Sequence, residues 1–378
     1  MEILLDGVRA IGIGQIVMML VGGLLLYLGI KREYEPTLLV PMGLGTILVN
    51  FPFSAMITQF NAISGVEEIG VLDTLFDAGI ATELFPLLLF IGIGAMIDFG
   101  PLLQNPFMLL FGAAAQFGIF FTMVVAGLCG FSLFEAAAIG IIGAADGPSA
   151  IYVSNTLLGR DNPLMGSIAV VAYSYMALVP LIQPMAIKLV TTKKERQIRM
   201  SYKASSVSKP VKILFPIIIS IVAGLLAPQS LPLVGFLMFG NLLRECGVLE
   251  RLSMTAQNEL VNIVSILLGF TIAVQMTADK FLNIKTLFIL VFGLVAFTMD
   301  TIGGVLFAKF LNLFRKNKIN PMIGAAGISA FPMAARVVQK LAIDEDKQNF
   351  LLNFSIGANV AGQIGSVIAA GMVLSFLK

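Results

Sequence analysis

Long apolar stretches separated by short polar intervals dominate this chain. Six lie in the first half, at 10–30, 37–52, 83–100, 106–131, 133–158 and 163–190, and six follow at 210–227, 231–248, 259–277, 284–311, 319–342 and 349–377. Many approach or exceed the roughly 20 residues that a membrane-spanning helix needs. The alternation typical of membrane β-strands is missing from the sequence. The pattern therefore predicts an all-α polytopic membrane protein.

The composition supports the same fold class. Of the 378 residues, 58% are hydrophobic and 12% are charged, whereas soluble domains carry about 25% charged residues. Lipid must therefore be the main solvent. The sequence has no His, which removes the commonest acid–base residue. Cys129 and Cys246 lie in or beside apolar runs and suggest neither a disulfide framework nor a metal site.

Charged residues in the polar intervals predict which side of the membrane each interval faces. The interval 191–212 carries seven Lys or Arg against one acid, Glu195, and residues 309–318 repeat this bias. The positive-inside rule places both in the cytoplasm. The acidic interval 53–83 is expected outside, with a short amphipathic helix. These charge-based assignments are consistent with one another only if the segments 133–158 and 319–342 do not fully cross the membrane. Each segment, broken by Gly and Pro, would then enter and leave on one side.

The two halves of the chain resemble each other at a constant offset of 181 residues. Asp98 falls on Asp279, and the tetrapeptide IGAA occurs at both 142–145 and 323–326. We expect two inverted-topology repeats, residues 1–190 and 210–378, each with about five crossings plus one interrupted re-entrant segment. A cytoplasmic basic linker, 191–209, joins them. Interrupted helices form the ion and substrate sites of transporters built in this way.

Asp146 lies inside the first interrupted segment. A carboxylate at mid-membrane costs about 2.5–3.5 kcal/mol on insertion scales, and such residues are usually functional. Gly147 and Pro148 follow it, so the helix breaks and carbonyl groups become free. An all-oxygen environment suits a small hard cation. The alternative is a protonated Asp146 that caps a half-helix.

The second interrupted segment contributes polar groups of a different kind. Asn320 and Ser329 offer oxygen atoms, and Arg336 carries a permanent charge. If Arg336 lies inside the protein, its guanidinium fits a carboxylate bidentately. The alternative is that Arg336 extends to the cytoplasmic surface near Lys340.

Several other residues stand out in apolar surroundings. A buried phenol needs a partner, so Tyr175 or Tyr173 is interpreted as completing a cation shell or relaying a proton, with packing as the alternative. Asp300 is another intramembrane acid, but it has no counterpart in the repeat and ranks lower. Gly92 and Gly94 lie within an apolar run and predict close helix packing.

Three long motifs carry a resemblance that extends over nearly the whole chain. They read GAADGPSAIYVS at 143–154, YSYMALVPLIQP at 173–184 and NPMIGAAGISAFPMAARV at 320–337. In these motifs the chain resembles the beta subunits of sodium-translocating biotin-dependent decarboxylases, which act on oxaloacetate, methylmalonyl-CoA, glutaconyl-CoA or malonate. The N-terminal region looks shorter than in the oxaloacetate type, which favours the acyl-CoA decarboxylases.

The resemblance implies roles for individual residues. Asp146 would be a sodium ligand, and the sodium site would include Asn320, Gly324 and Ser329. The functional tyrosine falls on Tyr175, which would serve both the cation and the reaction, with Tyr173 as the alternative. Arg336 would bind the carboxylate of carboxybiotin and take part in its decarboxylation.

The same resemblance implies a mechanism and partners. Carboxybiotin on a partner carrier protein would be decarboxylated at the cytoplasmic face with uptake of a proton, and sodium would move outward. The cofactors would be a sodium ion and carboxybiotin. The partners would be the biotin carrier, a carboxyltransferase alpha subunit and a small membrane subunit, in a homo-oligomeric complex of a prokaryotic inner membrane, without nucleic acid. Composition alone also allows a sodium-coupled secondary carboxylate transporter, and an anchor for a soluble enzyme is the third interpretation.

Overall fold

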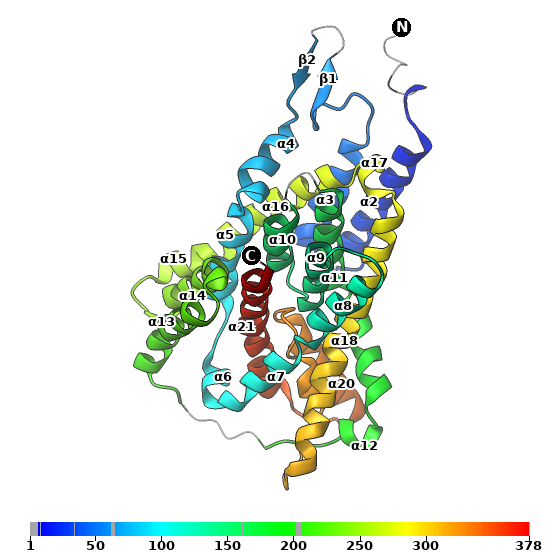
Figure 1. The fold of residues 1–378 in the computed structure, drawn as a ribbon. Helices are drawn as coiled ribbons and strands as arrows, with labels where there is room; N and C mark the ends of the chain where they lie inside the picture. The colour runs from blue at the N-terminus through cyan, green and yellow to red at the C-terminus, as the bar shows by residue number, and fades with distance from the viewer. Residues whose placement is uncertain are drawn as a thin grey trace.

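The computed structural model describes residues 7, 9–33, 35–61, 65–159, 162–201 and 206–377, and helices make up most of it (Figure 1). A small hairpin pairs strand β1 (Gln59–Asn61) with β2 (Val66–Glu68) in antiparallel register. The sequence does not predict this hairpin. The expected short helix in the same interval is α4 (Val71–Phe76). Parts of the expected units 1–190 and 191–209, including Lys203, fall outside the described residues.

The first half of the described chain contains these helices before the basic linker: α2 (Ile13–Lys31), α3 (Pro36–Val49), α4, the π-helical turn η1 (Asp77–Ala81), α5 (Leu84–Met96), α6 (Gly100–Gln104), η2 (Pro106–Met108), α7 (Leu109–Ala114), α8 (Phe117–Leu128), α9 (Leu133–Gly140), η3 (Ile141–Ala144), α10 (Gly147–Leu158) and α11 (Pro163–Val190). Short gaps separate α7 from α8 and η3 from α10. Both breaks fall inside apolar stretches of the sequence.

The linker and the second half contain α12 (Lys193–Arg196), α13 (Lys209–Leu226), η4 (Pro228–Ser230), α14 (Leu231–Glu245), α15 (Glu250–Thr255), the π-helical turn η5 (Ala256–Leu260), α16 (Val261–Ile272), η6 (Ala273–Gln275), α17 (Ala278–Phe281), α18 (Ile284–Phe314), α19 (Met322–Ala325), α20 (Met333–Glu345) and α21 (Leu352–Leu377). The predicted interruption of 319–342 is the gap between α19 and α20.

Six helical stretches are long and apolar enough to cross a membrane: Ile13–Lys31, Pro106–Leu128, Lys209–Leu226, Glu250–Gln275, Ile284–Phe314 and Leu352–Leu377. The number rises to eight if two bent pairs each count as one span. The chain is therefore a multi-pass helical membrane protein. Helix α3, with 14 residues, is shorter than the roughly 20 residues of a full crossing. The count of five crossings per half stays a prediction.

Helix α11 is one of the bent pairs. Its two parts, Leu164–Met176 and Leu178–Val190, meet at 70°. Pro180 lies inside the helix, and a proline ring clashes with the carbonyl group four residues earlier, here that of Met176. The bend therefore follows directly from the sequence, and it comes just after Tyr173 and Tyr175.

The two basic clusters lie together at one end of the molecule. Lys309 Nζ donates a hydrogen bond to the carbonyl oxygen of Val190 at 3.1 Å and lies 3.0 Å from a carboxylate oxygen of Glu195. The hairpin β1–β2 lies at the opposite end (Figure 1). This arrangement agrees with the sides predicted from charge for the basic and the acidic intervals.

Glycines allow α5 and α14 to approach until their backbones touch. A Cβ atom added at Gly94 would lie 1.8 Å from the carbonyl oxygen of Leu237, and one added at Gly240 would lie 1.9 Å from that of Ile91. A Cβ atom at Gly92 would lie 2.0 Å from the side chain of Val261. The close packing predicted for Gly92 and Gly94 is confirmed.

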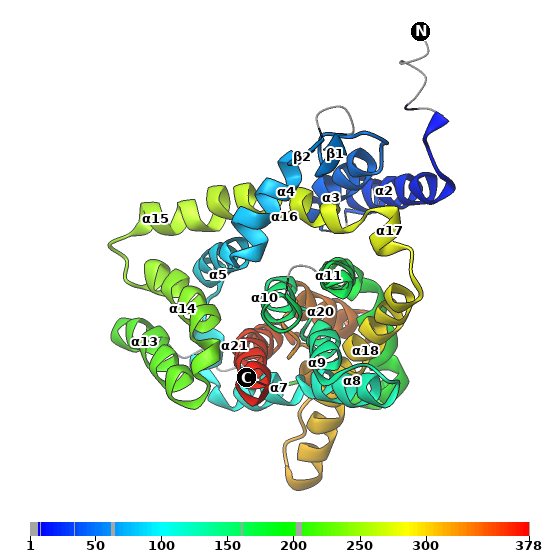
Figure 2. The ribbon, with the colours of Figure 1, turned by 45° about the horizontal axis from the view of Figure 1, so that its top comes forward.

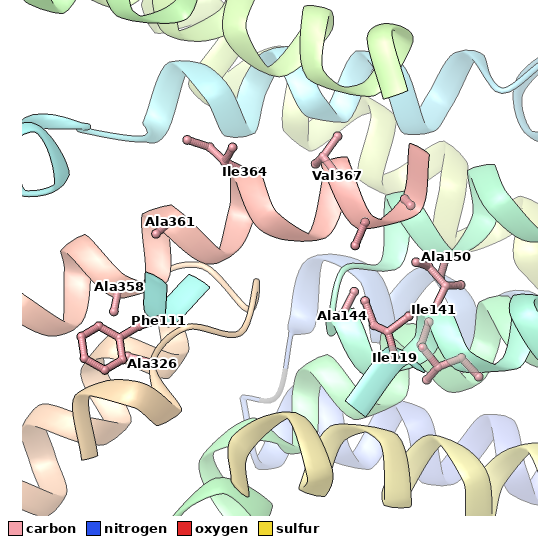
Figure 3. Packing of buried hydrophobic residues seen from close by; sticks show 14 of the residues in the cluster. Phe111, Ile119, Ile141, Ala144, Ala150, Ala326, Ala358, Ala361, Ile364 and Val367 are labelled. Atoms are coloured by element: carbon pink, nitrogen blue, oxygen red, sulfur yellow. The ribbon is translucent and has the colours of Figure 1, made fainter. Parts of the chain in front are cut away.

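Helix α21 runs through the interior of the molecule, beside α7, α10 and α14 (Figure 2). Most of its residues are buried. In Figure 3 its apolar side chains Ala358, Ala361, Ile364 and Val367 are drawn with the buried residues Phe111 and Ala326 nearby. The core thus places α21 beside both interrupted segments.

Two glycines of α14 provide a test of this packing. Gly240→Ala places a methyl group against Ile91, so we expect the free energy of unfolding to fall by about 1–3 kcal/mol, as in other overpacked cores. The matched control is Gly235→Ala, because a Cβ atom at Gly235 meets no other atom within 4 Å. Alanine there should be neutral or stabilise the helix by up to about 1 kcal/mol. Thermal unfolding in detergent measures both, and equal effects would contradict the packing.

Candidate functional site

The first interrupted segment consists of helix α9, the 3-10 turn η3 and, after a short break, helix α10. A capping box between Ser132 and Glu135 starts α9. After the 3-10 turn η3, Ala145 adopts a left-handed conformation with φ of 52°. Asp146 is then the N-cap residue of α10, and Pro148 occupies its first turn, where a missing N–H group does no harm. The local sequence therefore brings the Asp146 carboxylate to the break.

Hydroxyl and backbone groups surround the Asp146 carboxylate. Ser149 donates to it from Oγ at 2.6 Å and from its backbone N–H at 3.5 Å, and Ser366 Oγ lies 3.4 Å away. The side chain is 3% exposed. Within the described part of the chain, no Lys or Arg pairs with it. An ionised carboxylate at this depth therefore lacks a compensating positive charge.

The second interrupted segment meets the first at Ser329. The backbone N–H of Ser329 donates to the carbonyl oxygen of Ala144 at 3.2 Å, and Ser329 Oγ donates to that of Gly362 at 3.0 Å. Gln363 Nε2 in turn donates to the Ser329 carbonyl. Backbone that has left a helix is tolerated at membrane depth only where the protein satisfies it. Here α21 and the two interrupted segments provide hydrogen-bond partners for one another's backbone groups.

Helix α21 presents a polar stripe to this junction: Asn359, Gln363 and Ser366. Asn359 Nδ2 donates to the carbonyl oxygen of Ile328 at 2.6 Å. The amide oxygens of Asn359 and Gln363 are buried without a hydrogen-bond donor among the described residues. These residues and Ser149 were not predicted from the sequence. The signal that could have found the stripe is the spacing of its three polar residues, which puts them on one face of an apolar helix.

The two candidate tyrosines lie in different places. The ring of Tyr173 lies against Gly147, where an added Cβ atom would be 2.3 Å from it, and its hydroxyl is buried without a partner among the described residues. Tyr175 packs on Gly293 of α18 and donates its hydroxyl to the carbonyl oxygen of Leu290 at 2.6 Å. Tyr173 is therefore the tyrosine beside the Asp146 turn.

Asn320, the first residue of the third motif, holds the linker in this structure. Its Nδ2 donates to the carbonyl oxygens of Arg196 and Ile198 at 2.8 and 2.9 Å, and its Oδ1 accepts the N–H of Met322 at 3.1 Å. The structure places no hydrogen bond between Asn320 and Asp146. Its side-chain hydrogen bonds therefore fix the start of the second interrupted segment to the basic linker.

Gly324 and Arg336 lie on either side of the break between α19 and α20. A Cβ atom at Gly324 would lie 2.0 Å from the carbonyl oxygen of Gly304, so Gly324 lets α19 touch α18. Arg336 is exposed on α20, and no carboxylate in the described ranges forms an ion pair with it. Its guanidinium is therefore free to meet an anion from outside the chain.

This geometry can bind a monovalent cation but lacks the acids of a divalent metal site. The described residues contain no group of three or more Cys, Asp or Glu that could hold a metal ion. The junction instead combines one carboxylate with hydroxyl, amide and carbonyl oxygens. Hard cations take such oxygen ligands, and a single carboxylate balances one positive charge.

Comparison with known proteins agrees with the motifs. The family model for the Na+-transporting oxaloacetate decarboxylase beta subunit matches residues 14–377. The chain belongs to this family. The family predicted from the three motifs is thereby confirmed.

Relatives of two kinds resemble this family member at similar levels. Oxaloacetate decarboxylase beta chain 2 of Salmonella typhi is 47% identical, with 98% of this chain and 97% of the relative aligned. Methylmalonyl-CoA decarboxylase subunit beta of Propionigenium modestum is 49% identical over 98% of this chain and 96% of the relative. The Veillonella parvula subunit of the same name is also 49% identical, over 99% of this chain and 96% of the relative.

The two tyrosines allow a matched test of the site geometry. Tyr175→Phe removes the hydrogen bond to Leu290, so we expect the free energy of unfolding to fall by about 0.5–1.5 kcal/mol. Tyr173→Phe removes a buried hydroxyl that has no partner here, so stability should stay unchanged or rise. Thermal unfolding of the two variants in one detergent compares them. The reverse order of stability would contradict the placement of the two hydroxyls.

Proposed function

We propose that this chain decarboxylates carboxybiotin on a partner carrier protein and couples this reaction to outward sodium transport. The observation that carries the proposal is the Asp146 carboxylate, which is buried where two interrupted helices meet and has no positive partner among the residues that the structure describes. Membership of the decarboxylase beta family supplies the reaction. A buried carboxylate among oxygens supplies the place for sodium.

The sodium site would use the oxygens gathered at this junction. Asp146 provides the charge and Ser329 a hydroxyl, as the motifs suggest, and the free amide oxygens of Asn359 and Gln363 lie on the adjoining helix. Asn320 and Gly324 are assigned to the site from the third motif. For Asn320 to bind sodium, its Oδ1 would have to share or release the N–H of Met322 that it accepts in this structure. Movement of the interrupted segments would make that exchange part of transport.

Decarboxylation needs an anion site and a proton. Carboxybiotin carries an N-carboxylate; CO2 leaves, and the ring nitrogen takes up one proton. Arg336, exposed and free of ion pairs among the described residues, would hold the carboxylate bidentately. Tyr175 is the proton donor that the motif suggests, with Tyr173 as the second candidate. The packing favours Tyr173, because its hydroxyl is not committed to a carbonyl group.

The two halves would form inverted repeats, 1–190 and 210–378, joined by the linker 191–209. Matching pairs of contacts support this. If α3 corresponds to α14 and α5 to α16, the contact of α3 with α16 is matched by that of α14 with α5. If α7 corresponds to α18 and α11 to α21, the contact of α7 with α21 is matched by that of α18 with α11. A π-helical turn also precedes both α5 and α16. Five crossings and one re-entrant segment in each repeat would put the two interruptions at the midplane.

The chain works with other decarboxylase subunits in a bacterial membrane. The specific partners we propose are the biotin carrier, a carboxyltransferase alpha subunit and a small membrane subunit, in a complex that contains several copies of this chain. The membrane would be the inner membrane, where the cytoplasmic face meets the carrier. The carboxyltransferase would select the acyl substrate.

Transport by the reconstituted complex tests the role of Asp146. Inverted vesicles should accumulate radioactive sodium when carboxybiotin is supplied. Asp146→Asn should lower both uptake and decarboxylation by roughly tenfold or more, because a charged ligand is lost. The matched control is Asp279→Asn, the same chemical change at an exposed carboxylate of α17, which should transport as the parent does.

Three outcomes would overturn the proposal. Sodium uptake without any biotin carrier would make the protein a sodium-coupled secondary carboxylate transporter. Undiminished pumping by Asp146→Asn, with Asp279→Asn equally active, would show that the ion passes elsewhere. Decarboxylation without sodium uptake in the parent would separate the enzyme activity from transport.

A further inference from the structure

Asp300 is a second carboxylate inside the membrane region, and the proposed function gives it no role. Its side chain is fully buried. It lies near the middle of α18, which runs from Ile284 to Phe314. At 1.5 Å per residue, about 24 Å of helix separates it from one end and about 21 Å from the other. The carboxyl group is therefore distant from water on both sides.

One oxygen of this carboxyl group is bound as an anion would be. Oδ1 accepts the backbone N–H of Gly118, whereas the N–H of the next residue, Ile119, donates to the carbonyl oxygen of Gln116 at 3.2 Å. Gly118 belongs to the first turn of α8, which begins at the break after α7. N–H groups in a first turn have no partner within their own helix, and the helix dipole there favours negative charge. This side of the niche stabilises the ionised form.

The other oxygen is in the opposite situation. Oδ2 is buried without a hydrogen-bond partner among the described residues. A Cβ atom at Gly143 would lie 2.8 Å from Oδ2, and one at Gly118 would lie 2.5 Å from Oδ1. Two glycines thus keep the niche open. A buried, unpaired carboxylate oxygen favours a bound proton. The surroundings of Asp300 therefore stabilise both the ionised form, through Oδ1, and the protonated form, through Oδ2.

The elements packed against Asp300 bring no other charge to it. Helices α7, α8, α19 and η3 contain no ionisable residue, and Glu135 of α9 pairs with Lys285. From α11, Tyr175 packs at Gly293, which is two turns of α18 away. The remaining ionisable side chains of α11 and α18 are Tyr173, which lies against Gly147, and Lys188 and Lys309 toward the helix ends. Among the described residues, no Lys or Arg side chain lies at Asp300 to neutralise it, so a proton can take that role.

We propose that Asp300 is a proton-binding site that takes up and releases one proton during transport. The carboxylate and the proton combine to a carboxylic acid, and no other bond changes. Gly143, which covers Oδ2, belongs to η3, the turn that leads into Asp146. Movement of this turn, or a cation bound at Asp146, would change the proton affinity of Asp300, because charges interact strongly in a low dielectric.

Infrared titration of the reconstituted protein tests the site without sodium. The parent and Asp146→Asn should both show a protonated carboxyl band that grows on acidification and that Asp300→Asn lacks. Asparagine is nearly isosteric and keeps an oxygen for Gly118, so the fold should survive. A band that stays constant with pH, or one that persists in Asp300→Asn, would overturn the proton site. If Asp300→Asn fails to fold, Gly143→Ala replaces it, and an unchanged titration midpoint would overturn the proposal.

Added sodium tests the coupling, which rests on the proposed function. In the parent it should move the midpoint of the Asp300 band to lower pH, and in Asp146→Asn it should not. A band that titrates but ignores sodium in the parent would overturn the coupling and leave the proton site intact. A band that responds equally in both proteins would place the sodium away from Asp146, which contradicts the proposed function.

Discussion

A buried carboxylate with no positive partner among the described residues is the constraint on which the rest of this structure depends. The hydrogen bonds to Asp146 within the described chain come from hydroxyl and N–H groups, and these stabilise a negative charge without cancelling it. Burial of such a charge is costly, so the site is complete only when a cation or a proton joins it. This requirement links the fold to ion transport, because whatever neutralises Asp146 must enter and leave through the protein.

The broken helices follow from the same constraint. A cation needs carbonyl and side-chain oxygens, but a continuous helix uses its carbonyl groups internally. The breaks at Ala145 and after α19 free carbonyl groups from their hydrogen bonds within the helix. Side-chain amides then donate hydrogen bonds to some of these carbonyl groups. Gln363 binds the carbonyl of Ser329, Asn359 that of Ile328, and Gln183 that of Ala325. Glycines at the crossings bring these elements close enough to do so.

Sequence reasoning predicted the features that depend on local chemistry. The membrane class followed from apolar runs, both interruptions from Gly and Pro, and the family from three long motifs. It missed the stripe on α21, because three polar residues in a long apolar run look unimportant until the neighbouring segments are in place. It also could not foresee that the linker occupies the amide of Asn320 or that Tyr173 lies beside Asp146. Each depends on contacts between distant parts of the chain.

The position of the bound cation tests this account most directly. Crystals of the protein with thallium in place of sodium would show the ion by its anomalous scattering. If sodium binds at Asp146, a peak will lie within coordination distance of its carboxylate, at the junction of Ser329 with the polar stripe of α21. A peak elsewhere in the membrane region, with none at Asp146, would contradict it.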